Sequence, residues 1–238
     1  MTGMLASVRD REEAKILTAC EIDILDLKDP NAGALGALPT GLVKSIVNEV
    51  NGRIPVSATV GDVPCRADVL YPKINAMAGA GVDLVKIGVF GDVSDPGVLD
   101  MLKDFSRRHV RLVLVLFAED MPHTTGFDVF AGTGITGVML DTREKATGTL
   151  RKKVSDQDLL QFVHNCKQAG LLCGLAGSLG VQDIGPLLRL QPDYLGFRGA
   201  LCRDSRRGNH IDVDAVMRVR TLISGPGVPN FDKDAITV

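Results

Sequence analysis

Apolar residues follow two alternating patterns along the chain. Short, nearly continuous apolar runs are typical of strands buried on both faces, and they alternate with longer stretches whose apolar residues recur every three or four positions, as in helices. Such alternation predicts a parallel α/β fold. The eight runs that predict strands are Met4 to Val8, Asp23 to Lys28, Pro55 to Val60, Asp83 to Lys86, Val110 to Phe117, Thr136 to Asp141, Leu171 to Leu175 and Asp193 to Phe197.

Helical periodicity fills most of the segments between these strands. Ser155 is a predicted N-cap because Asp158 stands three positions later, as in a capping box, and Thr40 is a second predicted cap. Residues 124–134 make a poor helix, so the fifth crossover should be short or irregular, and the polar segment from Arg143 to Val154 should be a loop. The other predicted helices are Arg11 to Cys20, Ala67 to Ala80, Pro96 to Arg108 and Val213 to Ile223.

Eight strands and a similar number of crossovers favour a closed (β/α)8 TIM barrel. The length of 238 residues is close to the ~250 typical of this fold. We expect one catalytic domain over residues 1–224, followed by an aperiodic tail over 225–238. An open, doubly wound sheet is the alternative, but no GxGxxG motif follows an early strand.

Three charged residues interrupt the apolar strands. Lys28 and Lys86 lie in runs that should be buried, and Asp141 ends the sixth strand. Lysine is almost never fully buried unless it has a partner or a function. The three residues stand at the C-terminal ends of alternate strands, where barrel enzymes place catalytic groups. We therefore expect their side chains to lie near one level at the mouth of the barrel.

The alternation of side chains along a strand indicates which way these charges point. Asp26 and Lys28 share one face of the second strand, while the two intervening leucines face the helices. The same alternation leaves aliphatic residues on the helix-facing side of the fourth and sixth strands, so the charged set points into the barrel. Lys145 follows Asp141 by four residues in a loop, where a solvated charge and a role in the site fit the sequence equally well.

Amines and carboxylates that share a partly desolvated mouth suit Schiff-base chemistry. Burial and a second ammonium group both lower a lysine pKa, and a neutral amine can attack a carbonyl. A nearby carboxylate, Asp26 or Asp141, can then carry the proton transfers. The pattern alone does not identify the nucleophile, and we choose Lys28 because it has the closer carboxylate, Asp26. Purely structural ion pairs are the less favoured alternative, because buried ion pairs seldom add much stability.

Two glycine-rich loops follow the last two strands. Barrels that take phosphorylated substrates often bind the phosphate on backbone N–H groups of these loops. We predict that Gly177 and Ser178 after the seventh strand, and Arg198 and Gly199 after the eighth, bind substrate phosphate, because glycine admits an anion and arginine offers a bidentate fork. Helix capping with a surface arginine is the alternative. The basic turn from Arg206 to His210 is either solvated or holds a second phosphate, and the segment from Lys145 to Lys153 is the alternative place for that phosphate.

Composition narrows the class of protein. The net charge of −2 argues against nucleic-acid binding. The five cysteines are widely spaced without a CxxC pair, which suits reduced thiols in the cytoplasm better than a disulfide framework. No signal peptide and no run near ~18 apolar residues is seen, so we expect no membrane span. No metal-binding motif is present either, so we expect an enzyme without metal or cofactor.

Six segments stand out together: Asp26-Leu27-Lys28, Ser57 to Pro64, Val85 to Gly88, Met139 to Thr142, Leu175 to Ser178 and Arg198-Gly199-Ala200. In this combination they resemble a known family, (5-formylfuran-3-yl)methyl phosphate synthase. The resemblance runs in order from the first strand to about Asp212. It implies a TIM barrel that condenses two triose phosphates into a phosphorylated furan aldehyde, with loss of phosphate and water, in methanofuran biosynthesis.

The resemblance also implies roles for particular residues. It places the Schiff-base lysine at Lys28, the second strand-end lysine at Lys86, the acid/base carboxylates at Asp26 and Asp141, and a further functional lysine at Lys145. We accordingly expect a carbon–oxygen lyase that acts on glyceraldehyde 3-phosphate, and a homo-oligomer. Two rival functions are a class I aldolase for another sugar phosphate, which releases no inorganic phosphate, and a non-catalytic barrel that only binds phosphorylated metabolites.

Overall fold

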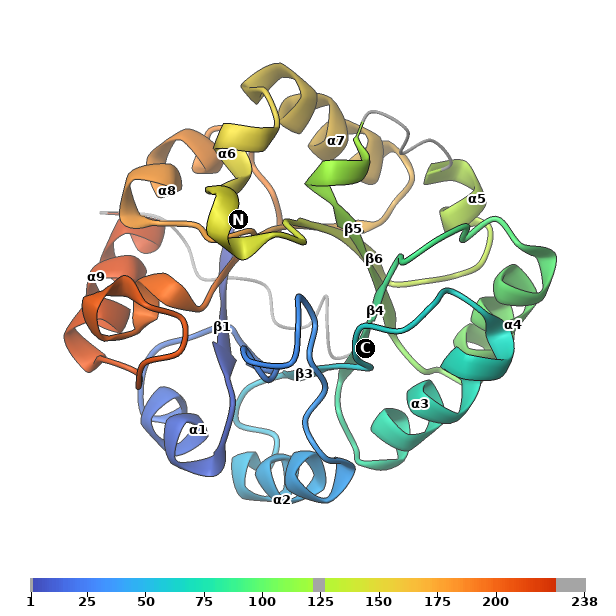
Figure 1. Cartoon of the computed structure of the whole chain (residues 1–238), viewed down its shortest axis with the longest axis horizontal. Coiled ribbons are helices and arrows are strands. Elements are labelled where there is room, and N and C mark those ends of the chain that lie inside the picture. Colours follow the sequence, from blue (N-terminus) through green and yellow to red (C-terminus); the bar gives the residue numbers. More distant parts are fainter. Residues whose placement is uncertain (1, 122–126, 226–238) are drawn as a thin grey trace.

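Eight parallel strands close into a barrel in which each strand pairs with its neighbours in sequence and β8 pairs with β1 (Figure 1). The computed structural model describes residues 2–121 and 127–225. The predicted (β/α)8 TIM barrel is therefore confirmed. The strands are β1 (Gly3–Val8), β2 (Ile24–Leu27), β3 (Val56–Thr59), β4 (Leu84–Gly88), β5 (Leu112–Phe117), β6 (Gly137–Asp141), β7 (Leu172–Leu175) and β8 (Tyr194–Phe197).

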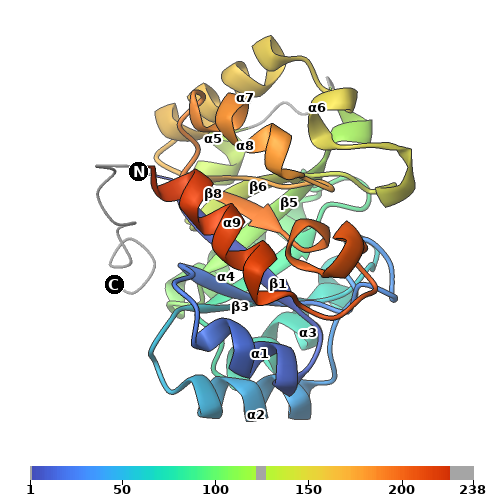
Figure 2. The same cartoon turned by 90° about the vertical axis from the view of Figure 1, so that its left-hand side faces the viewer.

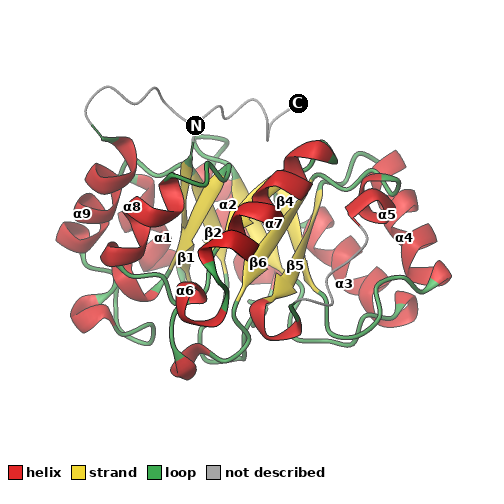
Figure 3. Cartoon of the chain, turned by 90° about the horizontal axis from the view of Figure 1, so that it is seen from above, coloured by secondary structure: helices red, strands yellow, loops and turns green. Residues whose placement is uncertain are grey.

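Helices form an outer ring around these strands (Figures 1 and 3). In the described parts of the chain none of them is both long and apolar enough to cross a membrane. The helices are α1 (Arg11–Thr18), α2 (Thr40–Val50), α3 (Ala67–Gly79), α4 (Pro96–Arg107), α5 (Phe127–Ala131), α6 (Leu150–Lys153), α7 (Asp156–Gln168), α8 (Val181–Leu188) and α9 (Val213–Ser224).

Several helices differ from the prediction. The one-turn α6 lies inside the expected polar loop, and α8 was not predicted because Gly185 and Pro186 weaken its helical pattern. Pro39, not Thr40, occupies the N-cap of α2, whereas Ser155 caps α7 as predicted by accepting a hydrogen bond from the backbone N–H of Asp158. The described part of the fifth crossover holds a short helix, α5. Residues 122–126 of this crossover, and residues 226–238 of the predicted tail over 225–238, lie outside the described residues.

The strand faces divide the core into two clusters, as the alternation of side chains predicted. Leu25 and Leu27 of β2, with Val85 of β4, belong to the larger cluster between the strands and the helices. Leu84 and Met139 belong to the smaller cluster inside the barrel. The aliphatic face of each strand therefore packs against the helices, and this leaves the charged residues of β2, β4 and β6 pointing inward.

Three aspartates form the same hydrogen bond at the N-terminal end of the barrel. Asp23, Asp83 and Asp193 stand directly before β2, β4 and β8, and each accepts a 2.7 Å hydrogen bond from a backbone N–H at the start of the preceding strand. Asp23 also pairs with Arg220 of α9 at 2.5 Å. This pair ties α9, which packs against β1 and α8, to the base of the barrel (Figure 2).

We predict that Asp23→Ala lowers the free energy of unfolding by about 2–4 kcal/mol, because it leaves the buried N–H of Met4 and the Arg220 guanidinium without their acceptor. Chemical denaturation followed by circular dichroism measures the change. Glu21→Ala, in the same loop but exposed, is the control and should stay within about 0.5 kcal/mol of the wild type. Equal effects of the two substitutions would show that the contacts of Asp23 with Met4 and Arg220 do not stabilise the barrel.

Candidate active site

A cavity of about 480 Å³ opens at the C-terminal ends of the strands. Its lining comes from β1, β2, β4, β6 and β8, from the loops that follow β2, β6, β7 and β8, and from α8 and α9. Six cationic side chains but only two carboxylates line it, although the whole chain carries a net charge of −2. The cavity therefore attracts anions. The charged lining residues are Lys28, Lys86, Lys145, Arg198, Arg207 and Arg218, with Asp26 and Asp141.

Asp26 is the centre of the deeper of two charge networks. Its side chain is fully buried, and one oxygen accepts a hydrogen bond from Ser7 while the other accepts one from Ser57, both at 2.7 Å. The amine of Lys86, which is 2% exposed, lies 2.6 Å from the same oxygen that Ser57 contacts. Three donors from β1, β3 and β4 therefore hold Asp26 as a carboxylate beneath the mouth.

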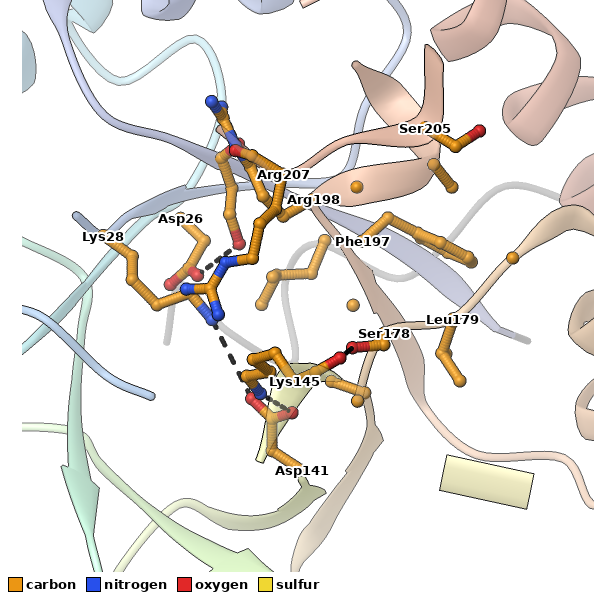
Figure 4. A pocket seen from close by; sticks show the side chains of 18 of the residues that line it. Asp26, Lys28, Asp141, Lys145, Ser178, Leu179, Phe197, Arg198, Ser205 and Arg207 are labelled. Atoms are coloured by element: carbon orange, nitrogen blue, oxygen red, sulfur yellow. Dashed lines mark hydrogen bonds and ion pairs between the residues drawn. The ribbon is translucent and has the colours of Figure 1, made fainter. Parts of the chain in front are cut away.

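Asp141 is the centre of the outer network. The amine of Lys145 lies 2.5 Å from one of its oxygens, and the amine of Lys28 lies 3.8 Å from the other. The backbone N–H of Thr142 donates a further hydrogen bond at 2.7 Å. Figure 4 shows the side chains of Lys28, Asp141 and Lys145 converging at the cavity. Asp141 thus pairs with two lysines from different parts of the barrel, Lys28 after β2 and Lys145 in the loop after β6.

The structure brings the predicted lysines and aspartates together but corrects the reason for choosing Lys28. Asp26, two residues away on the same strand, forms its ion pair with Lys86 instead. The carboxylate nearest to the Lys28 amine is Asp141, on the far strand β6. The pairing follows from how the closed barrel juxtaposes β2, β4 and β6, which spacing along one strand does not reveal.

Burial and charge act in opposite directions on the carboxylates. Burial alone raises the pKa of Asp141, but the charges of Lys145 and Lys28 outweigh it and lower the pKa to about 2. The same balance, with Lys86 as the strongest opposing charge, lowers the pKa of Asp26. Both carboxyl groups therefore stay ionised at neutral pH, where they neutralise part of the positive charge.

Burial dominates for two of the lysines. It lowers the pKa of Lys145 to about 8, with Asp141 opposing part of the shift. It also lowers the pKa of Lys86, which Asp26 opposes in the same way. A lysine with a pKa near 8 exchanges its proton readily at physiological pH, so Lys145 is suited to acid/base catalysis.

Two further carboxylates hold the loops that carry this chemistry, and the sequence reasoning assigned them no role. Asp62, after β3, accepts hydrogen bonds from the backbone N–H groups of Ala34 and Leu35 in the loop after β2, both at 2.7 Å. Glu119, after β5, accepts them from Arg143 and Glu144 in the loop after β6, at 2.9 and 3.0 Å. Asp62 lies in one of the segments that carried the family resemblance, whereas no sequence signal marked Glu119.

The loop after β7 presents its backbone to the cavity. Gly177 has a φ of 108° and Ser178 a φ of 50°, and a Cβ added to Gly177 would lie 2.7 Å from Thr142. Within the described residues, the N–H groups of Gly177 and Ser178 have no protein acceptor. The Ser178 hydroxyl donates to the carbonyl of Lys145 at 3.2 Å, so it supports the loop after β6. The backbone amides, more than the hydroxyl, are therefore available to an anion.

Arg198 does not offer the fork that the sequence suggested. Its guanidinium forms a buried pair with Glu13, with contacts of 2.5 and 3.0 Å, and it donates its other N–H groups to the carbonyls of Ser7, Arg207 and Asn209. All five of its N–H groups thus have protein acceptors. Arg207, in the basic turn, also lines the cavity. Gly199 also lines the cavity, and its predicted contact with phosphate stays a prediction.

The five cysteines are free thiols. Among residues 2–121 and 127–225, no group of three or more histidine, cysteine, aspartate or glutamate side chains is arranged to hold a metal ion.

The sequence is similar to one named family along most of its length. A family model described as 4-HFC-P synthase matches residues 4–220. A (5-formylfuran-3-yl)methyl phosphate synthase from Methanocaldococcus jannaschii is 31% identical, over 92% of this chain and 98% of its own. One from Methanosarcina acetivorans is 30% identical, over 86% and 92%. A Methylorubrum extorquens protein that carries the same name provisionally is 42% identical, over 94% and 92%.

Solved structures share the fold at low sequence identity. A 3-hexulose-6-phosphate synthase superimposes with a TM-score of 0.65 at 19% identity, covering 92% of this chain and 99% of its own. Phosphoribosyl anthranilate isomerase from Thermus thermophilus gives a TM-score of 0.64 at 11% identity, covering 94% and 98%. These likenesses support the barrel fold alone.

We predict that Asp141→Asn lowers the pKa of Lys145 below its value of about 8, because it removes the negative charge that opposes burial and leaves the repulsion from Lys28. The titration can be followed by NMR of the lysine Cε in protein labelled at lysine. Asp214→Asn, at an exposed position of α9, is the control and should leave the midpoint unchanged. A Lys145 midpoint near 10.5 in the wild type, or a rise in Asp141→Asn, would contradict this electrostatic account.

Proposed function

The chain belongs to the 4-HFC-P synthase family, and we propose on that premise that it makes (5-formylfuran-3-yl)methyl phosphate from two molecules of glyceraldehyde 3-phosphate. One inorganic phosphate and two water molecules leave in the balanced reaction. The pathway is the biosynthesis of methanofuran or of an analogue. The enzyme is accordingly a phosphate-eliminating lyase that uses a lysine Schiff base.

The arrangement of three amines and two carboxylates at one cavity carries this proposal. Lys28, Lys86 and Lys145 all line the cavity, together with Asp26 and Asp141. A condensation through an imine needs a nucleophilic amine and groups that move protons at successive steps. Structural ion pairs alone would give the same contacts, so the distinction has to come from chemistry at the amines.

Lys28 is the amine that we assign as nucleophile. Lys86 is 2% exposed and held 2.6 Å from Asp26, and Lys145 is held 2.5 Å from Asp141. Lys28 has the loosest contact of the three, 3.8 Å from Asp141, and its side chain is 9% exposed. Its amine is therefore the least tied to a partner, and a carbonyl in the cavity can reach it with the smallest loss of existing contacts.

The residues around Lys28 supply the proton transfers. In our proposal Lys28 attacks the keto form of one triose phosphate, water leaves, and loss of a carbon-bound proton converts the imine to an enamine. The enamine carbon then bonds to the aldehyde of the second molecule, and elimination of phosphate, ring closure and dehydration follow. Hydrolysis of the imine frees the Lys28 amine and takes up again the water that left when the imine formed. Lys145 and Asp141 exchange protons near the imine, while Lys86 and Asp26 do so deeper in the cavity.

One substrate phosphate binds at the loops after β7 and β8. The N–H groups of Gly177 and Ser178 support this proposal, because they can donate hydrogen bonds to a phosphate. Gly199 supports it too, because it lines the cavity and has no side chain to keep a phosphate away from the backbone. We further propose that the enzyme works in the cytoplasm as a homo-oligomer, without a metal or an organic cofactor and without a nucleic-acid or membrane partner. These last points rest on composition and on the family resemblance.

Incubation of the purified protein with glyceraldehyde 3-phosphate alone tests the function. We predict that furan absorbance appears together with one inorganic phosphate per furan formed. A class I aldolase on another sugar phosphate would release no inorganic phosphate, and a binding protein would give neither signal.

Lys28→Arg should abolish this turnover, because the guanidinium keeps the positive charge but stays protonated and cannot form an imine. Lys86→Arg should slow turnover without abolishing it. Lys44→Arg, at an exposed position of α2, is the control and should behave as the wild type. Full activity of Lys28→Arg would overturn the assignment of the nucleophile.

A further inference from the structure

Two arginine side chains hold the backbone of the turn formed by residues 206–210 through hydrogen bonds. Arg198 donates to the carbonyls of Arg207 and Asn209 at 2.9 and 3.1 Å, and Arg9 donates to the carbonyl of Gly208 at 2.6 Å. Both of these arginines are in turn held by Glu13, which is 1% exposed. A buried carboxylate on α1 thus fixes the backbone of a turn that lies at the cavity.

This support presents one side chain, that of Arg207, to the cavity. Within the described residues its guanidinium has one protein acceptor, the carbonyl of Gly33 in the loop after β2, at 3.2 Å. By contrast, every N–H group of the Arg198 guanidinium donates a hydrogen bond to a protein acceptor. Figure 4 shows Arg207 reaching over the cavity toward Lys28, well apart from Ser178 in that view. Most of the hydrogen-bonding capacity of Arg207 is therefore left for a ligand.

The electrostatic surroundings indicate the charge of that ligand. Arg207 is half-buried, and burial lowers its pKa while Asp141 opposes the shift, so the guanidinium lies within electrostatic reach of the outer network. The cavity already holds an excess of cationic groups. Another half-buried cation is unfavourable there unless an anion accompanies it.

We propose that Arg207 forms a second phosphate subsite, distinct from the backbone amides of Gly177 and Ser178, and that Glu13 and Arg198 are its positioning residues. The ligand is a phosphate ester or free phosphate, because the planar guanidinium matches two phosphate oxygens at once. This inference rests on the proposed function only in that two phosphorylated substrates require two such subsites. Arg207 also donates to the carbonyl of Gly33 in the loop after β2, and this contact fixes one edge of the guanidinium.

Titration with inorganic phosphate, followed by NMR, tests this subsite without any catalysis. The Nε–H signal of Arg207 should shift and saturate, and so should the backbone amides of Gly177 and Ser178, each with its own midpoint. The Nε–H signal of Arg203, exposed on the same loop, should not move. Saturation of the Gly177 and Ser178 amides with no shift at Arg207 would overturn the proposal.

Variants separate positioning from a merely structural role. In Glu13→Gln the phosphate dissociation constant read at Arg207 should rise by about ten- to a hundred-fold, while that read at Gly177 stays unchanged. Arg198→Lys should act in the same direction, and it keeps the test available should Glu13→Gln fail to fold. An unchanged constant at Arg207 in a folded variant would remove the positioning role.

The outcome is distinguishable from a failure of the proposed reaction. Phosphate binding at Arg207 in a protein that makes no furan would leave the subsite standing and overturn the chemistry. Furan production with no shift at Arg207 on addition of phosphate would support the proposed reaction and overturn the subsite. Glyceraldehyde 3-phosphate added to Lys28→Arg, in place of inorganic phosphate, shows whether the subsite accepts the ester as well as the free anion.

Discussion

The positive charge enclosed at the mouth of the barrel is the constraint on which the rest of the structure depends. Six cationic side chains line one cavity beside two carboxylates. Such a cluster is tolerable only if every charge has a partner or a ligand. Asp26 holds Lys86, and Asp141 holds both Lys28 and Lys145. Glu13 neutralises Arg198, and the positive charge that remains suits phosphorylated substrates.

Much of the fold could be predicted from the sequence because its rules are local. Alternating side chains determined that the charges of β2, β4 and β6 point inward, and the run of strands and helices indicated a closed barrel. The partners of the charges could not be predicted in this way. Lys28 lies two positions from Asp26 but pairs with Asp141, and Arg198 is held by Glu13, which is 185 positions away. Closure of the barrel creates both contacts.

Hydrogen bonds to the backbone hold the loops after β2 and β6 in place. Asp62 fixes the loop after β2, and Glu119 fixes the loop that carries Lys145, each through two consecutive N–H groups. These carboxylates follow strands adjacent to the loops they hold, so the barrel itself defines where the amines lie. Positioning of this kind reduces the reorganisation that a multistep condensation would otherwise require.

The central claim is that Lys28 becomes covalently attached to the substrate. Sodium borohydride added with triose phosphate should reduce the imine and leave a stable adduct, and peptide mass spectrometry should locate it on the peptide that contains Lys28. Lys86→Arg should retain some of this trapping, because Lys86 moves protons and is not the point of attachment. An adduct on Lys86 or Lys145, or no adduct on any lysine while furan still forms, would contradict the claim.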